Sequence, residues 1–156
     1  MNAALKMHQL TTRFDRPLAD WGGALLSLAI RVYVGWAFFK AGLTKIEDWE
    51  TTLFLFEDEY QVPLLPPELA AWMGTLGELV LPVLLFVGLL SRPAALGLFV
   101  VNAMAVLSYP ALFEFECPAA LQDHFYWGAM LLVLVAFGPG RLSLDAWLTA
   151  RGRKAP

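Results

Sequence analysis

Long apolar stretches alternate with short polar segments along the chain. Each stretch is close to the roughly 20 residues that a helix needs to cross a ~30 Å hydrocarbon core. Four such spans are predicted, the last two on the short side, at approximately residues 21–43, 69–90, 93–109 and 121–138. The pattern therefore predicts an all-α membrane protein, an antiparallel four-helix transmembrane bundle that forms a single domain over residues 1–156.

Two shorter segments are predicted to be amphipathic helices at the membrane surfaces. In the outer one, residues 49–60, the apolar side chains recur along one helical side: Trp49, Leu53, Phe56 and Tyr60. That spacing is typical of a helix lying in the interface with its acids in water. The inner one, residues 143–151, begins at Ser143, which is a good N-cap residue.

Composition and charge placement support the same class and add an orientation. Hydrophobic residues make up 58% of the chain and charged residues 16%, whereas a soluble domain has about a quarter charged residues. Cations flank one end of the spans: Lys6, Arg13, Arg16, Arg92, Arg141, Arg151, Arg153 and Lys154. The loops at the other end are acidic, with Lys45 as their one clear cation: Glu47, Asp48, Glu50, Glu57, Asp58, Glu59, Glu68, Glu114, Glu116 and Asp123. The positive-inside rule then predicts that both termini lie in the cytoplasm.

Several function classes are not expected. No basic stripe with interleaved aromatics suggests nucleic acid as a partner. The one cysteine, Cys117, cannot form an internal disulfide, a CxxC pair or a thiolate zinc site. It is interpreted as a free thiol, and a disulfide with a partner protein is the alternative. No metal-ligand spacing, P-loop, dinucleotide fingerprint or nucleophile elbow occurs, and Arg31 makes the first apolar run a poor signal peptide.

Polar residues inside the spans are the candidate functional groups. An acidic residue at the centre of a spanning helix costs roughly 2.5–3.5 kcal/mol, so Glu78 must meet a partner. At 100° per residue, Arg31 shares a face of the first span with Gly35, Gly42 and Lys45. Lys40 lies on the opposite face and is expected to reach the headgroups as an anchor.

Estimated depths bring these groups together in the outer half of the bundle. Glu78 and Arg31 are expected near mid-membrane as an ion pair, Asn102 slightly higher, and Lys45 and His124 near the mouth. This cluster can be a structural ion pair, a proton path, a quinone headgroup site or a small-ligand site. The geometry leaves these alternatives open.

Certain motifs resemble the DoxX family of small four-helix membrane proteins, over roughly residues 25–148. They are Arg31-x3-Gly35, Gly42-x2-Lys45, "GELVLPVLLFVGLLSRPAAL" at 77–96 and "GPGRLSLDAWL" at 138–148. The stretches "LFLFEDEY" and "VPLLPPELAAW" resemble the branch found beside genes for copper-responsive metal-buffering peptides. The resemblance implies that the protein is a subunit of a quinone-linked sulfur oxidoreductase or a partner in an oxidative or metal stress system.

The leading functional hypothesis is an inner-membrane accessory protein of a metal- or redox-stress system. It would act with protein partners in the membrane or periplasm through the polar cluster, without independent enzyme activity. The alternatives are a quinone-binding oxidoreductase subunit and a small proton-coupled transporter. No resident cofactor or metal is predicted, quinone is the candidate ligand, and a homo-oligomer stays open.

Overall fold

The computed structural model describes residues 6–7, 10–113 and 119–153. Four of its helices are long and apolar enough to cross a membrane. They are α3 (Gly23–Glu47, continuous with η2, Leu18–Gly22), α5 (Pro67–Val87), α6 (Ser91–Ser108) and α7 (Ala119–Phe137). The described ranges contain no strand. The all-α fold with four potential spans is therefore confirmed, and the chain is a multi-pass membrane protein.

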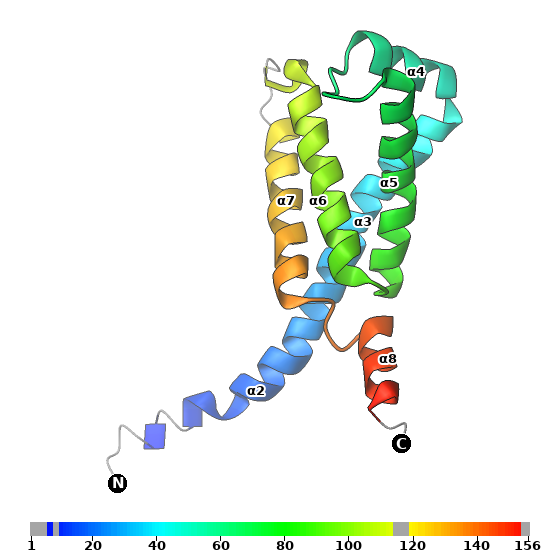
Figure 1. The fold of residues 1–156 in the computed structure, drawn as a ribbon. Helices are drawn as coiled ribbons and strands as arrows, with labels where there is room; N and C mark the ends of the chain where they lie inside the picture. The colour runs from blue at the N-terminus through cyan, green and yellow to red at the C-terminus, as the bar shows by residue number, and fades with distance from the viewer. Residues whose placement is uncertain (1–5, 8–9, 114–118, 154–156) are drawn as a thin grey trace.

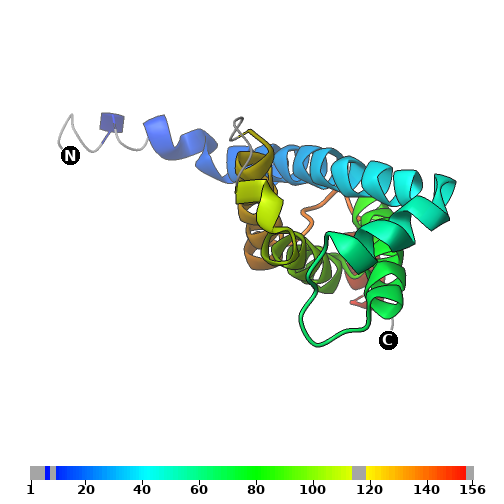
Figure 2. The ribbon, with the colours of Figure 1, turned by 90° about the horizontal axis from the view of Figure 1, so that it is seen from above.

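The four long helices pack as a ring in which α3 lies next to α5 and α7, and α6 lies next to the same two helices. Figure 1 shows them running alternately up and down, with α3 tilted across the bundle. Seen from above in Figure 2, α4 (Trp49–Asp58) covers one end of this ring. The N-terminal α2 (Asp15–Pro17) and the C-terminal α8 (Leu144–Gly152) both leave at the opposite end.

Close approach of α3 and α5 depends on small residues. A Cβ added at Gly42 would lie 2.9 Å from Leu79, and one added at Gly35 would lie 2.6 Å from Phe86. In lipid, where apolar side chains gain little by leaving their surroundings, such backbone proximity is a main source of helix association. The glycine positions therefore determine the axial register of α3 against α5. This register sets which polar side chains of the two helices meet.

Helix α4 packs against the bundle through its apolar side. Asp48 caps its start by accepting a hydrogen bond from the Thr51 amide at 3.0 Å. Phe56 is buried against Ala70 and Ala71 at the beginning of α5. The apolar side of the predicted surface helix thus faces protein. The extended residue Pro66 leads into α5, and the first turn of α5 packs against α4.

The opposite end is closed by the segment that leads into α8. Asp145 accepts hydrogen bonds from the amides of Leu90 and Ser91, both at 2.9 Å, and its own amide donates to Gly88 at 2.9 Å. Burial opposes ionisation of Asp145, but the bonds from Ser91 and Leu90 outweigh it and lower the pKa of that carboxyl. Ser143 accepts from the Ala146 amide at 3.2 Å, which confirms its predicted role as the N-cap of α8.

Candidate functional site

A pocket lies at the α4 end of the bundle, where Figure 1 shows α5 and α6 separating beneath α4. Its volume is about 450 Å³, and all four long helices contribute to its wall. Most of the lining side chains are apolar, as in typical small-molecule sites. The polar and titratable residues among them are Lys45, Tyr60, Glu78, Ser108, Tyr109 and His124.

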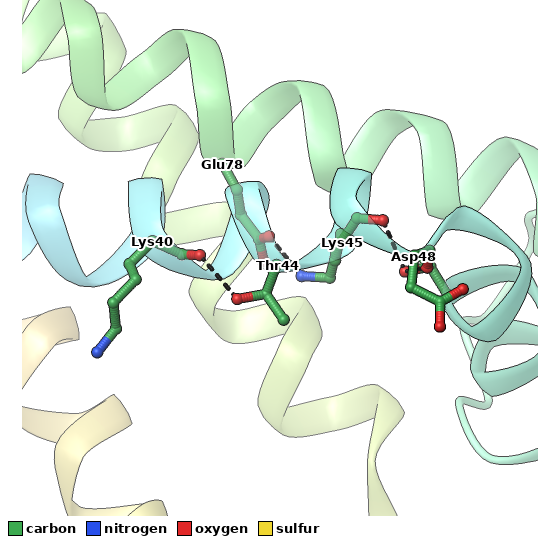
Figure 3. Close-up of polar contacts among 6 residues, drawn as sticks. Lys40, Thr44, Lys45, Asp48 and Glu78 are labelled. Carbon is green, nitrogen blue, oxygen red and sulfur yellow. Dashed lines mark hydrogen bonds and ion pairs between the residues drawn. The ribbon is translucent and has the colours of Figure 1, made fainter.

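One wall of the pocket carries an ion pair. The ammonium of Lys45, in the last turn of α3, donates to the carboxylate of Glu78 on α5 (Figure 3). The Lys45 side chain is 21% exposed and that of Glu78 is 8% exposed. A Cβ at Gly42 would lie 3.1 Å from Glu78 Cβ, so the glycine leaves room for this approach. The charge of Glu78 is thereby compensated inside the membrane-spanning region.

The predicted ion pair between Arg31 and Glu78 is wrong. The Arg31 guanidinium donates instead to the carbonyl oxygens of Leu85, at 3.0 Å, and of Leu142. Helix α3 continues to Glu47, about one turn beyond its predicted end, so Arg31 lies farther from the α4 end of the bundle than expected. Since Gly42 is beside Glu78, the stretch from Arg31 to Gly42 separates the two levels by about 16 Å.

Arg31 therefore belongs to the other end of the bundle. Its side chain is fully buried and joins α3 to the last turns of α5 and to the segment before α8. Within the described residues its Nε atom has no hydrogen-bond partner. Asp145 supplies an opposite charge that acts on Arg31 without a direct ion pair. These contacts indicate a structural position outside the pocket.

The second polar group of the pocket comes from α6 and α7. The Asn102 amide Nδ2 donates to the backbone carbonyl of His124 at 2.9 Å, and Asn102 Oδ1 lies 2.9 Å from His124 Nδ1. His124 lines the pocket, whereas Asn102 lies behind it and is 5% exposed. The structure thus brings Lys45, Glu78 and His124 to one cavity, with Asn102 holding the imidazole.

Other polar lining residues were not singled out by the sequence. The Tyr60 and Tyr109 rings meet nearly at right angles, 5.2 Å apart. Burial raises the pKa of Tyr60, and the neighbouring Tyr109 adds to the shift. The amide of Gln61 donates to the Ser108 carbonyl at 2.7 Å and ties the segment after α4 to α6. The available signal was positional, because Tyr109 falls on the helical face of Asn102.

Two further expectations concern residues away from the pocket. Lys40 is exposed, and Figure 3 shows its side chain directed away from Glu78, in keeping with an anchoring role. The described part of the chain contains no group of three or more His, Cys, Asp or Glu side chains that could hold a metal ion. Cys117 lies outside the described residues.

Comparison with known proteins finds a family match and a similar protein. Residues 26–111 match the DoxX family. The chain is also similar to a protein of Haemophilus influenzae that is described as uncharacterized. The two are 30% identical over 136 residues, covering 84% of this chain and 88% of the relative. No solved structure matches the chain.

Proposed function

The chain belongs to the DoxX family, and we propose that it is a quinone-binding accessory subunit of a bacterial inner-membrane redox system. The observation that carries the proposal is the pocket of about 450 Å³ at the α4 end. Its size falls within the range of small-molecule sites. Partner proteins in the membrane or periplasm would supply and consume the electrons of the bound ring.

The distribution of polar groups supports a ring with oxygen substituents. The Lys45 ammonium has three N–H donors, of which Glu78 takes one, so donors remain for a carbonyl or hydroxyl oxygen. His124 offers a second polar contact from α7. Between them the wall is apolar and aromatic, with Phe38 and Trp127 packed edge to face at 5.6 Å. Such a wall suits a flat ring with an apolar tail.

The experiment is binding of a short-tailed benzoquinone to the protein in lipid nanodiscs, followed by quenching of tryptophan fluorescence. Trp127 lines the pocket, so we expect saturable quenching that weakens in Trp127→Phe. Ala105→Phe fills the pocket and should abolish saturable binding. Leu107→Phe is the matched control, since Leu107 lies on the same helix and is 69% exposed.

Two outcomes would remove the proposal. One is the absence of saturable quenching in the wild-type protein above that of empty nanodiscs. The other is unchanged affinity in Ala105→Phe while Leu107→Phe also binds normally, because the ring would then occupy another place. A role in metal or redox stress enters only as the physiological setting, since its support is the resemblance of the sequence to that branch.

A further inference from the structure

The hydrogen bonds of Asn102 determine which of its atoms faces His124. The backbone carbonyl of His124 can only accept a hydrogen bond, so the Asn102 atom 2.9 Å from it is the amide nitrogen. The amide oxygen therefore faces the ring and lies 2.9 Å from Nδ1. An amide oxygen also only accepts, so the hydrogen of this contact belongs to Nδ1 of His124.

This assignment defines the opposite edge of the imidazole. In the neutral ring only one nitrogen carries a hydrogen, so a protonated Nδ1 leaves Nε2 with a free lone pair. No described residue hydrogen-bonds to Nε2. The ring is held on another side by Trp127, whose centroid is 5.1 Å away at an interplanar angle of 74°. His124 is thus fixed in orientation as well as in tautomer.

We propose that Asn102 is a positioning residue that makes His124 Nε2 a hydrogen-bond acceptor for the ligand in the pocket. The inference rests on the proposed function and adds a ligand class to it. A ring with an aromatic hydroxyl can donate to Nε2 while a second oxygen accepts from Lys45. A fully oxidised quinone offers only acceptors, so the pocket prefers the hydroxyl-bearing, quinol-type form of the ring.

The tautomer is tested directly by nitrogen-15 NMR. The chain has two histidines, His8 and His124, so in His8→Gln every imidazole signal comes from His124. We expect a protonated Nδ1 and an unprotonated Nε2 at neutral pH. In Asn102→Leu, which removes the acceptor facing Nδ1, the signals should change to a mixture of tautomers. A purely structural role for Asn102 would leave the tautomer unchanged.

The ligand class is tested with two redox-inert rings, octyl 4-hydroxybenzoate and octyl 4-methoxybenzoate. They share the ester oxygens and the tail, and only the first can donate a hydrogen bond. The preference is the ratio of the methoxy to the hydroxy dissociation constant. We expect it to fall by about three- to tenfold in Asn102→Leu, because only the fraction of rings with an unprotonated Nε2 can then accept the hydroxyl. Comparing ratios removes the different partitioning of the two esters into lipid.

Thr75→Val is the control, because Thr75 is a buried polar residue of α5 outside the pocket wall, and its hydroxyl has no partner among the described residues. This variant should keep the preference. The inference is overturned if Thr75→Val removes the preference, or if the wild-type protein binds the two esters equally. It is also overturned if Nε2 carries the hydrogen or both nitrogens are protonated. If the protein binds neither the two esters nor the benzoquinone, the proposed function itself is removed.

Discussion

At the residue scale, the pocket wall depends on two charges that compensate each other. Removing the Glu78 carboxylate leaves the Lys45 ammonium partly buried and unpaired, so Glu78→Leu should destabilise the protein more than Glu78→Gln, whose amide oxygen still accepts from Lys45. In a double-mutant cycle, Lys45→Leu and Glu78→Leu should show a coupling of about 1–3 kcal/mol. The measurement is thermal unfolding in detergent.

A second double-mutant cycle and one single variant serve as controls. Arg31→Leu combined with Glu78→Leu should be additive within about 0.5 kcal/mol, because these side chains lie at different levels of the bundle. Lys40→Gln should change stability by less than about 0.5 kcal/mol, since that side chain is exposed. Coupling between Arg31 and Glu78 would contradict the geometry described above.

Sequence reasoning identified the pocket residues better than their pairing. The cost of a carboxylate in lipid predicts that Glu78 has a cationic partner. Arg31 and Lys45 both lie on the glycine-lined face of the first span, and a helical projection does not give their levels along the axis. The level depends on where α3 ends and on how Gly42 packs against α5, which are properties of the packed helices.

At the element scale, the turn between α5 and α6 has no room for a side chain at Gly88. Gly88 has φ +70°, and a Cβ there would lie 2.4 Å from Arg31 Nη1 and 2.6 Å from Ser143 Cβ. Gly88→Ala should therefore destabilise the protein by more than the ~1–2 kcal/mol of left-handed backbone strain alone. Gly23→Ala is the matched control, because nothing lies within 4 Å of its Cβ, and it should stabilise α3 by about 0.5–1 kcal/mol. Equal unfolding temperatures for the two variants would contradict this packing.

Asp145 links the same turn to α8 and gives stability a dependence on pH. Its pKa is lower folded than unfolded, so its contribution is present above the ordinary value of about 3.9 and is lost as the pH falls through the folded value. Asp145→Asn replaces one acceptor by a donor that faces a backbone amide, with a loss of about 1 kcal/mol at neutral pH. The difference in unfolding temperature between wild type and variant should shrink below about pH 4.

The sequence only partly predicts the contacts of Asp145. The Ser143 and Asp145 spacing predicts the start of α8 and an acid in its first turn. The amides that Asp145 accepts from belong to Leu90 and Ser91, more than fifty positions earlier. Local spacing does not report such a contact, because it arises only when the α5–α6 turn and the α8 segment meet.

At the scale of the whole molecule, the number of long helices followed from hydrophobicity, but the pocket did not. Its volume depends on the separation of α5 and α6 beneath α4. Phe56 packs on the start of α5, and the Gln61 amide donates to the Ser108 carbonyl, so the α4 segment contacts both helices of this wall. Both contacts join segments that a periodicity argument treats as independent helices and loops.

Membrane orientation is the remaining prediction at this scale. Asp58 ends α4 at one end of the bundle, and Arg153 follows α8 at the other, and both are exposed. Because cations gather at the α8 end and acids at the α4 end, the positive-inside rule places Arg153 in the cytoplasm. With Cys117 replaced by serine, a membrane-impermeant maleimide should label Asp58→Cys in intact spheroplasts. It should label Arg153→Cys only after permeabilisation. Labelling of both positions from the same side would mean that α4 and α8 do not lie across the membrane from each other, which would contradict the predicted topology.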